Sequence, residues 1–463
     1  MSKSIKQVMS KLTDNASIYG WVRTTRSSSN ILGFCVVNDG STVNGIQIVL
    51  STEFISEERI THFFKNVNIG TYITCSGNMI VSPAKGQKYE MQLLDYDIKG
   101  TVADGYPLAK SKMNLDTLRE HIHLRGRTNT FGSIFRIRSS LTKIIHDFYH
   151  DNGFLHLDPN IITRNECEGG AGVFQLTEND ISKMTNISKY DWSKDHFGTP
   201  VYLTVSSQLQ LEAIACSMGN VYTMNKSFRS EHSSTTKHVS EFTHLEIEMI
   251  NINLDDLMNI SERMIKHVIT RIFETNIEDI DNLNKIISKG LIEKLNYLMI
   301  CDYKRMKYTD VIDEINNDTI CDASNKLHFG DDLGSVHENY ITKKYNSPVF
   351  VSHWPMKLKS FYMKQCVNDN MNDLCESYDL LMPYGIGELI GASMREDNYD
   401  KLSAMMKEKG IGNIDFYTDL RKYGSCPHGG FGLGFDRLLM LITGIQNIKD
   451  VIPFPVYYKN CSF

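Results

Sequence analysis

Residues 227–248, which read SFRSEHSSTTKHVSEFTHLEIE, constrain the chain more than any other stretch. The pattern predicts a strand, a polar loop and a second strand in which acidic and apolar residues alternate. Within it, Arg229 offers a planar guanidinium for a phosphate, and Phe242 offers an aromatic face for a base. Acidic residues lie near both. This combination favours a site that uses ATP to adenylylate a substrate.

Alternation in the second strand places its apolar residues on one face and its other residues on the opposite face. The second face consists of Phe242, His244, Glu246 and Glu248. Taken alone, the pattern is equally typical of a half-buried strand whose acidic face is solvated.

A glycine-rich segment, GGFGLGFDRLLML, covers residues 429–441. It lacks the Gly-Lys-Ser/Thr ending of a P-loop and does not match the Gly-x-Gly-x-x-Gly turn of dinucleotide-binding proteins. Gly430, Gly432 and Gly434 alternate, so in a strand they leave one face bare for a flat ligand. Arg437 then lies in the first turn of the following helix. The same residues also fit close packing of a strand on a helix, beside a surface arginine.

Carboxylates recur in a third segment, YDLLMPYGIGELIGASMRED. Asp379 and Glu388 flank a Pro/Gly turn, so they can face one another on adjacent strands. Oxygen ligands of this kind, together with substrate phosphates, suit Mg²⁺. Arg395 follows Glu388 at an odd offset, so a bend is required if both are to share one site. The alternative is that both carboxylates are ordinary turn or edge residues.

The composition excludes several classes of protein. The chain has 463 residues, 41% hydrophobic and 22% charged, as expected for a globular protein of two or three domains. Its net charge of -6 argues against a general basic surface, so any contact with nucleic acid must use local patches. The ten cysteines form no Cys-x-x-Cys pair, which argues against a zinc ribbon and favours a reducing cytoplasm. No apolar run reaches the roughly 20 residues of a membrane span, and the first residues lack the apolar core of a secretory signal.

Five short β-like runs separated by turn signals occupy residues 17–100. They fit a closed barrel of the OB type, or another small β-barrel with no role in nucleic-acid binding. Downstream, helical periodicity over residues 134–148 stops at Asn152-Gly153. A strand pattern follows, in which Pro159 indicates a sheet edge or a strand end.

The rest of the chain mixes strands and helices. Residues 201–250 predict strand, helix, strand, loop and strand, and residues 253–310 predict polar helices with Asn253 as an N-cap. Residues 348–365 and 374–395 return to strand character before the closing glycine-rich strand and helix. Antiparallel strands with helices outside predict an α+β domain of about 350 residues.

Together these segments resemble the class II aminoacyl-tRNA synthetases. Residues 227–249 look like motif 2 of that family, and GGFGLGFDRLLMLITGIQNIKDVIPFP looks like motif 3. The helix and strand that end at Pro159 resemble motif 1, and the three occur in the family's order. A barrel in front of them points to the subgroup for aspartate, asparagine and lysine. TVSSQLQLEAIAC, GIGELIGASMRE and DLRKYGSCPHGGFGLGFDRL are most similar to the asparagine-specific, bacterial-type members.

The resemblance implies an α+β chain with an N-terminal five-stranded OB-type β-barrel and a class II catalytic domain, an antiparallel sheet flanked by helices. It implies an OB-fold anticodon-binding domain at 1–105, a hinge at 106–120 and a catalytic domain at 121–463 with a helical insertion over about 253–340. It further implies activation of L-asparagine by ATP with Mg²⁺, and transfer to tRNA(Asn). A homodimer formed through the motif 1 region and a cytoplasmic location complete these expectations.

The resemblance also assigns roles by motif position. Arg229 and Arg437 would be catalytic: Arg229 would hold the α-phosphate and the amino-acid carbonyl, and Arg437 would cap adenine and reach the γ-phosphate. The implied sets are Arg229, His238, Phe242 and Arg437 for ATP; Glu168, Gln208, Glu231 and Arg395 for the amino acid; Asp379 and Glu388 for Mg²⁺; and Arg23, Phe34 and Gln47 for the anticodon.

The choice between asparagine and aspartate depends on three positions. Arg395 matches the arginine that holds the side-chain oxygen in both enzymes, while Leu211 stands where aspartate-specific relatives have a lysine. Glu231 is expected to accept from the side-chain amide and to repel a carboxylate, because an unpaired buried charge is strongly disfavoured. The alternatives are an aspartate–tRNA ligase, against which Leu211 argues, and a relative that is no tRNA ligase. The barrel argues against a free-standing asparagine synthetase, and the retained motif residues argue against an inert tRNA-binding protein.

Three positions depart from the family pattern. Val456 stands where an arginine is usual, Lys237 where arginine is commoner, and Ala392 where a second glycine is usual. The cation missing at position 456 concerns the details of ATP or dimer contacts rather than the reaction.

Overall fold

A computed structural model describes residues 3–84, 86–109, 113–165, 172–180, 190–318, 326–367, 374–412 and 414–463. The chain forms two compact units: Met1–Arg136 with Glu278–Ile287, and Ile137–Ile277 with Ser288–Phe463. The first unit therefore extends past the expected boundary at residue 105 and takes in a segment from the middle of the chain. The division into a binding domain, a hinge and a catalytic domain stays a prediction.

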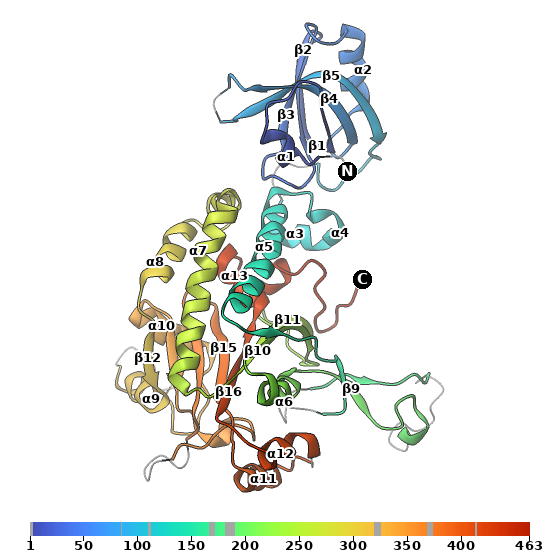
Figure 1. Cartoon of the computed structure of the whole chain (residues 1–463). Coiled ribbons are helices and arrows are strands. Elements are labelled where there is room, and N and C mark those ends of the chain that lie inside the picture. The colour runs from blue at the N-terminus through green and yellow to red at the C-terminus, as the bar shows by residue number, and fades with distance from the viewer. Residues whose placement is uncertain are drawn as a thin grey trace. The chain divides into compact units, whose positions relative to one another are not determined.

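Five strands of the first unit close into a barrel in the order β1-β2-β3-β5-β4 (Figure 1). They are β1 (Ala16–Ser29), β2 (Leu32–Asn38), β3 (Ile46–Ser51), β4 (Tyr72–Val81) and β5 (Tyr89–Gly100). Neighbours are antiparallel except β3 and β5, which are parallel. Buried residues alternate along the strands, as Ile46, Ile48 and Leu50 do in β3, because successive side chains point to opposite faces. The predicted five-stranded barrel is confirmed.

Short helices accompany the barrel strands in the first unit. They are α1 (Ile5–Met9), α2 (Glu57–Asn66), α3 (Leu115–Glu120) and α4 (Ile122–Arg125). Ser56 caps α2 by accepting from the Arg59 N–H, and Ile60 and Phe63 bury one face of this helix in the barrel core. The expected hinge at 106–120 thus contains α3.

The second unit is built on an eight-stranded sheet with the order β12-β13-β14-β15-β16-β11-β10-β6 (Figure 1). Its strands are β6 (Leu155–His156), β10 (Val221–Phe228), β11 (Glu241–Ile250), β12 (Lys304–Lys307), β13 (Val349–Ser352), β14 (Ser377–Met382), β15 (Gly387–Met394) and β16 (His428–Gly434). Only the two end pairs, β10–β6 and β12–β13, are parallel. The expected antiparallel sheet is confirmed for its six central strands.

Helices surround this sheet. The helix expected over residues 134–148 is α5 (Asn129–Asp151), and Gly153 follows it with a φ of +78°. Asn253 caps α7 (Leu254–Ile286) by exchanging hydrogen bonds with Asp256, as expected. The remaining helices are α6 (Gln208–Met218), α8 (Leu291–Ile300), α9 (Tyr308–Asn317), α10 (Ser335–Tyr345), α11 (Tyr399–Glu408), α12 (Asp415–Lys422) and α13 (Phe435–Thr443). Both α6 and α13 pack on β11.

Two strand predictions were wrong in extent. Strand structure in the segment 348–365 is limited to β13, because the chain turns into a 3₁₀ helix at Met356–Leu358. In FLHLDPNII only Leu155 and His156 pair with β10, and they do so at the sheet edge. Further along, the Pro159 carbonyl accepts from the Asn225 side chain instead of a strand partner. A small second sheet, β7-β9-β8, was not foreseen; it consists of β7 (Ile162–Thr163), β8 (Gln175–Leu176) and β9 (Val201–Leu203).

Strand register brings the expected site residues onto one face of the large sheet. Residues directly opposite one another on neighbouring strands project from the same face. One such row is Asp379, Gly391, Gly432 and Glu246, and the next is Ser377, Ser393, Gly430 and Glu248. Glycine therefore occupies the middle of each row, with polar side chains on either side.

The acidic face of β11 is not solvated. Glu246 and Glu248 are 3% and 1% exposed. Glu246 accepts from the Ser207 N–H at 2.9 Å, so its burial is compensated by hydrogen bonds. A half-buried strand with a solvated acidic face is excluded. Within the described ranges, no helix combines the length and apolar composition needed to cross a membrane.

Candidate active site

A pocket of about 150 Å³ opens on the glycine-bearing face of the sheet. Its lining comes from the loop between β10 and β11, from the facing strands and from α13. The residues include Arg229, Glu231, Lys237, His238, Phe242, His244, Glu388, Gly391, Gly432, Gly434 and Arg437. All four residues expected to bind ATP line this single pocket.

Arg229 and Phe242 form the base of the pocket. The Arg229 guanidinium carbon lies 5.4 Å from the centre of the Phe242 ring, within cation–π range. The Arg229 N–H donates to the Ser240 carbonyl at 3.0 Å, which closes the intervening loop. The Val456 carbonyl in turn accepts from the Ser240 N–H at 2.8 Å. Position 456, where the family's arginine is missing, thus supports the loop through its backbone.

His238 and Glu231 lie on the same loop. His238 Nδ1 is 2.5 Å from the Thr235 hydroxyl, and its Nε2 is 4.0 Å from a Glu231 oxygen. Burial, followed by the nearby Arg437 guanidinium, lowers the pKa of His238, and Glu231 opposes this shift. The imidazole is therefore biased toward its neutral form.

Arg437 enters the pocket from the first turn of α13. Its Nη1 donates to the Glu388 carbonyl at 2.6 Å. The preceding residue, Asp436, is buried and accepts from the Thr243 N–H at 3.0 Å and from Arg138 of α5 at 2.5 Å. These bonds fix the start of α13 against β11. Arg138 was not foreseen, because its place in a long helix carries no sign of this partner.

Asp379 and Glu388 lie on neighbouring strands and converge on Gly391. A Cβ at Gly391 would lie 3.3 Å from Glu388 Oε1 and 3.8 Å from Asp379 Oδ1, so glycine leaves a cradle between the oxygens. Burial raises the pKa of Asp379 to about 7; Lys359, 2.7 Å away, opposes this rise, and Glu388 adds to it. Two carboxylates around an open cradle suit a divalent cation. Lys359 was not foreseen.

Arg395 belongs to a buried network on the same face, one step along the strands. It is 3% exposed, donates to both oxygens of Glu248 and donates to the Ser393 hydroxyl at 2.6 Å. Its Nε also lies 3.7 Å from Glu212, which accepts from the Gln208 amide at 2.9 Å. The structure therefore brings Gln208 and Arg395 together through Glu212.

Glu212 is the centre of this network, and sequence reasoning missed it. It contacts Arg421 at 2.9 Å, the Tyr417 hydroxyl at 2.8 Å and His428 Nε2 at 3.1 Å. Burial alone would raise the pKa of Glu212, but Arg421 and His428 outweigh it and lower the pKa. The signal was present in the sequence as DLRKYGSCPH, which carries Arg421 and His428.

Cys216, Cys426 and His428 approach one another within 4.8 Å. Both ring nitrogens of His428 already face oxygens, Nδ1 the Cys426 carbonyl at 2.8 Å and Nε2 Glu212. His428 thereby connects Cys426 to the buried network. The eight cysteines in the described ranges are free thiols.

Three further expectations concern the amino-acid site and stay predictions. Glu168 lies outside the described residues. Leu211 packs with Ala215 and Val221 in an apolar cluster, so this side chain contributes to the core of the unit. Glu231 lines the pocket with Arg229, whereas Arg395 lies in the buried network.

The expected anticodon residues lie on the barrel. Phe34 and Gln47 are both half-buried, and Gln47 pairs with Val36, two residues from Phe34 on the same face of β2. The Gln47 amide donates to Glu90 at 3.3 Å. Arg23 lies at an irregularity of β1, between Val22 and Thr24. Burial lowers the pKa of Arg23 to about 10, and its side chain is half-buried, as are those of Phe34 and Gln47.

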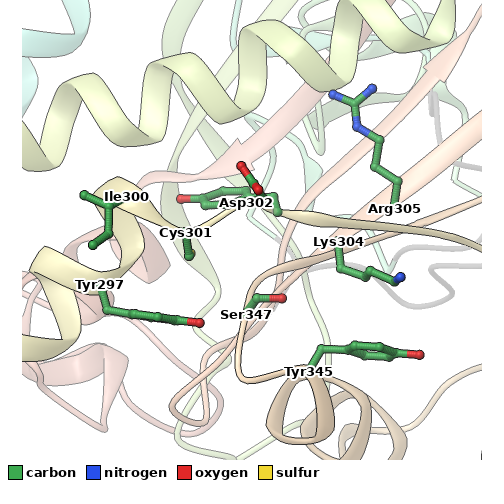
Figure 2. A pocket seen from close by; sticks show the side chains of 9 residues that line it. Tyr297, Ile300, Cys301, Asp302, Lys304, Arg305, Tyr345 and Ser347 are labelled. Carbon is green, nitrogen blue, oxygen red and sulfur yellow. The ribbon is translucent and has the colours of Figure 1, made fainter.

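Another hollow lies between the end of α8 and β12 (Figure 2). Its lining includes Tyr297, Lys304, Arg305 and Tyr345. The Lys304 ammonium lies 5.1 Å from the centre of the Tyr345 ring. Arg305 points away from this ring and donates to Asp255 at 3.0 Å. None of the predicted site residues lines this hollow.

Comparisons with known proteins agree with this geometry. Residues 114–457 match the family described as tRNA synthetases class II (D, K and N), and residues 16–98 match the OB-fold nucleic acid binding domain. An asparagine–tRNA ligase of Borreliella burgdorferi is 39% identical over 472 aligned residues, with 100% of both chains covered. The asparagine–tRNA ligase of Clostridium tetani is 38% identical, covering 98% of this chain and 97% of the relative.

Solved structures give the same result. The asparaginyl-tRNA synthetase of Pyrococcus horikoshii, complexed with asparaginyl-adenylate, superposes with a TM-score of 0.85 at 27% identity, covering 100% of this chain and 99% of that chain. The Entamoeba histolytica asparaginyl-tRNA synthetase, in complex with asparaginyl-adenylate, gives 0.82 at 30% identity, covering 98% of each. With its motif residues gathered in one pocket and its whole length matched, the chain belongs to the class II aminoacyl-tRNA synthetases of the aspartate, lysine and asparagine group.

Proposed function

We propose that this chain is an asparagine–tRNA ligase. It activates L-asparagine with ATP to asparaginyl-adenylate, releases pyrophosphate, and transfers the asparaginyl group to tRNA(Asn) with release of AMP. The full-length similarity to asparagine–tRNA ligases supports this reading. The observation that carries it is the pocket that gathers Arg229, Phe242 and Arg437 beside a buried, charge-balanced network on one face of the sheet.

Adenylate formation needs positioning and charge neutralisation more than proton transfer. The amino-acid carboxylate attacks the α-phosphorus of ATP in line, and pyrophosphate leaves with the electron pair of the broken P–O bond. Arg229 is proposed to hold the α-phosphate and the amino-acid carbonyl. Phe242 offers its ring to adenine, and Arg437 closes the pocket from α13. Holding both reactants in this geometry supplies much of the rate enhancement.

Asp379 and Glu388 are proposed to hold Mg²⁺ in the cradle above Gly391. When bound, the ion neutralises charge on the phosphate oxygens of ATP. The chain's own contribution is the buried Asp379 and its neighbour Lys359, which fix one wall of the cradle.

The buried network accounts for the choice of asparagine. Two guanidinium groups, Arg395 and Arg421, face two carboxylates, Glu212 and Glu248. Burial raises the pKa of Glu248 to about 7 against the opposing effect of Arg395, so negative charge is already costly there. An asparagine amide adds no charge beside Arg395, whereas an aspartate carboxylate adds an unbalanced one. Glu231 is proposed to accept from the amide and Glu168 to meet the α-ammonium.

The barrel is proposed to bind the anticodon of tRNA(Asn) through Phe34, Gln47 and Arg23. An aromatic ring and an amide suit an unstacked base. A homodimer formed through α5 and β6, and a cytoplasmic location, complete the proposal.

Charging of tRNA(Asn) transcripts with labelled asparagine tests the assignment. The wild-type chain should form asparaginyl-tRNA, and Arg437→Ala should reduce the initial rate by at least about 100-fold, because the pocket loses a phosphate-neutralising cation. Activity that survives this substitution would contradict the role of Arg437. Absence of charging by the wild-type chain would contradict the function itself.

A further inference from the structure

Glu338 is a half-buried carboxylate of α10 that belongs to none of the sites assigned above. The helix α10 packs against β15, the strand that carries Glu388. Burial raises the pKa of Glu338; Glu388 adds to this rise, while Lys237 and Arg437 oppose it. These three neighbours all line the pocket proposed for ATP.

The contact between Glu338 and β15 is made at the backbone. The Glu388 N–H donates a hydrogen bond to the Glu338 carboxylate. On the other side of the same residue, the Glu388 carbonyl accepts from Arg437 at 2.6 Å. Glu338 therefore holds the N–H of Glu388, and Arg437 holds its carbonyl. The Glu388 side chain itself points to the cation cradle.

Gly387 makes this approach possible. Its φ is +73°, and a Cβ there would overlap Glu338 Oε2 and lie 3.1 Å from Lys237 Nζ. The two charged side chains, one from α10 and one from the loop between β10 and β11, thus both approach the same bare glycine. Burial lowers the pKa of Lys237, and the Glu338 carboxylate opposes this shift.

We propose that Glu338 is a positioning residue for the phosphate end of the ATP site. It holds the Lys237 ammonium beside the pocket and fixes the Glu388 backbone against Arg437. Through these two contacts α10 couples the loop that carries Arg229 to the strand that carries Glu388. The inference depends on the proposed function, because it takes the pocket to be the ATP site.

The test is a double-mutant cycle with Glu338→Gln and Lys237→Met. Glutamine keeps an oxygen that accepts from the Glu388 N–H, so the fold should be retained while the charge contact to Lys237 is lost. Glu338→Gln should raise KM for ATP on the order of ten-fold in pyrophosphate exchange, with kcat and KM for asparagine unchanged. In the Lys237→Met background the same substitution should have less than about a two-fold effect. Glu408→Gln, an exposed substitution on α11, should match the wild type in every readout.

Calorimetric titration with ATP gives a readout independent of turnover and should show the same ten-fold weakening. An unchanged ATP affinity in Glu338→Gln, an equal rise in KM for asparagine, or additive effects with Lys237→Met would each overturn the positioning role. If the wild-type chain binds ATP but exchanges no pyrophosphate with asparagine, the proposed function fails. The calorimetric cycle still decides the role of Glu338 in that case.

Discussion

Arg229 shows how one residue depends on its surroundings for its role. Its guanidinium lies over Phe242, and its backbone is bonded to Ser240, so the charged group is held at the pocket rather than in solvent. A phosphate bound in such a partly desolvated place gains more from the charge than it would at an open surface.

Replacing Arg229 by glutamine keeps a polar side chain but removes the charge. We expect kcat/KM for asparagine-dependent pyrophosphate exchange to fall by roughly 100- to 1,000-fold, because the lost cation acts on the charge that develops in the transition state. The matched control is Arg271→Gln, which removes an arginine that pairs with Glu274 on the surface of α7. This control should stay within about two-fold of the wild type. A variant at position 229 as active as the control would refute the assignment.

The pH dependence follows from His238. Because burial and Arg437 lower its pKa below the ordinary value of 6.5, His238 binds its proton only at lower pH and stays mostly neutral at pH 6.5 and above. The pH profiles of exchange for the wild type and His238→Gln, each normalised at pH 8, should therefore superimpose down to pH 6.5. An NMR titration of the ring should give a midpoint below 6.5. If the wild-type profile shows an inflection at or above pH 6.5 and the variant profile lacks it, the lowered pKa of His238 is contradicted.

Sequence reasoning at this scale found residues that stand in local motifs and missed those that act through distant partners. Phe242, Arg229 and Arg437 lie in short patterns with a clear chemical meaning. Glu212 and Arg421 are far apart in the chain and meet only in the folded unit, so no spacing reveals their pairing. Lys359 and Glu338 were missed for the same reason.

At the scale of elements, alternating glycine in β16 determines what can lie on the sheet. A Cβ at Gly432 would overlap His244 Nε2, whereas a Cβ at Gly434 would meet Arg437 at 3.7 Å, an ordinary contact. The two glycines therefore differ in function, although they lie on one face of one strand. Gly432 makes room for a neighbour, and Gly434 leaves the pocket open.

This difference predicts the outcome of a matched pair of substitutions. Gly432→Ala should lower the free energy of unfolding by about 1–3 kcal/mol, because the added methyl group forces His244 and β11 to shift. Gly434→Ala should change it by no more than about 0.5 kcal/mol. Urea denaturation followed by circular dichroism measures both. Equal stabilities of the two variants would show that His244 does not pack as described.

Periodicity predicted elements best where local pattern and burial agree. The strand–helix–strand–loop–strand order of residues 201–250 was right, and so were α5 and the Asn253 cap. The pattern failed where pairing decides the outcome. Residues 353–365 have strand-like composition, but after Ser352 the chain forms a 3₁₀ helix and then only isolated bridges, such as that between Met363 and Arg395. The local pattern of β11 could not predict whether Glu246 and Glu248 are buried, because their partners lie on other elements.

At the scale of the whole molecule, the proposed roles divide between the two compact units. The residues proposed for adenylate formation all lie in the second compact unit, and those proposed for the anticodon lie in the first. The presence of a barrel and of an α+β unit was predictable from strand spacing and motif order. The inclusion of Glu278–Ile287 in the first unit was not, because a helical pattern carries no information about which distant segment it packs against.

This division predicts that a barrel substitution affects one step only. Phe34→Ala should raise KM for tRNA(Asn) by roughly ten-fold or more through loss of base stacking, with pyrophosphate exchange unchanged. Leu12→Ala, which changes an exposed apolar residue of the same unit, is the control. A loss of exchange activity in Phe34→Ala, or unchanged charging kinetics, would argue against the anticodon role.

The most direct test of the account is the amino-acid dependence of ATP–pyrophosphate exchange. The balanced charges of Arg395, Arg421, Glu212 and Glu248 are proposed to favour a neutral side-chain amide over a side-chain carboxylate. Exchange should therefore be supported by asparagine with a kcat/KM at least about 100-fold above that for aspartate. Exchange that is equal or faster with aspartate would contradict the central claim.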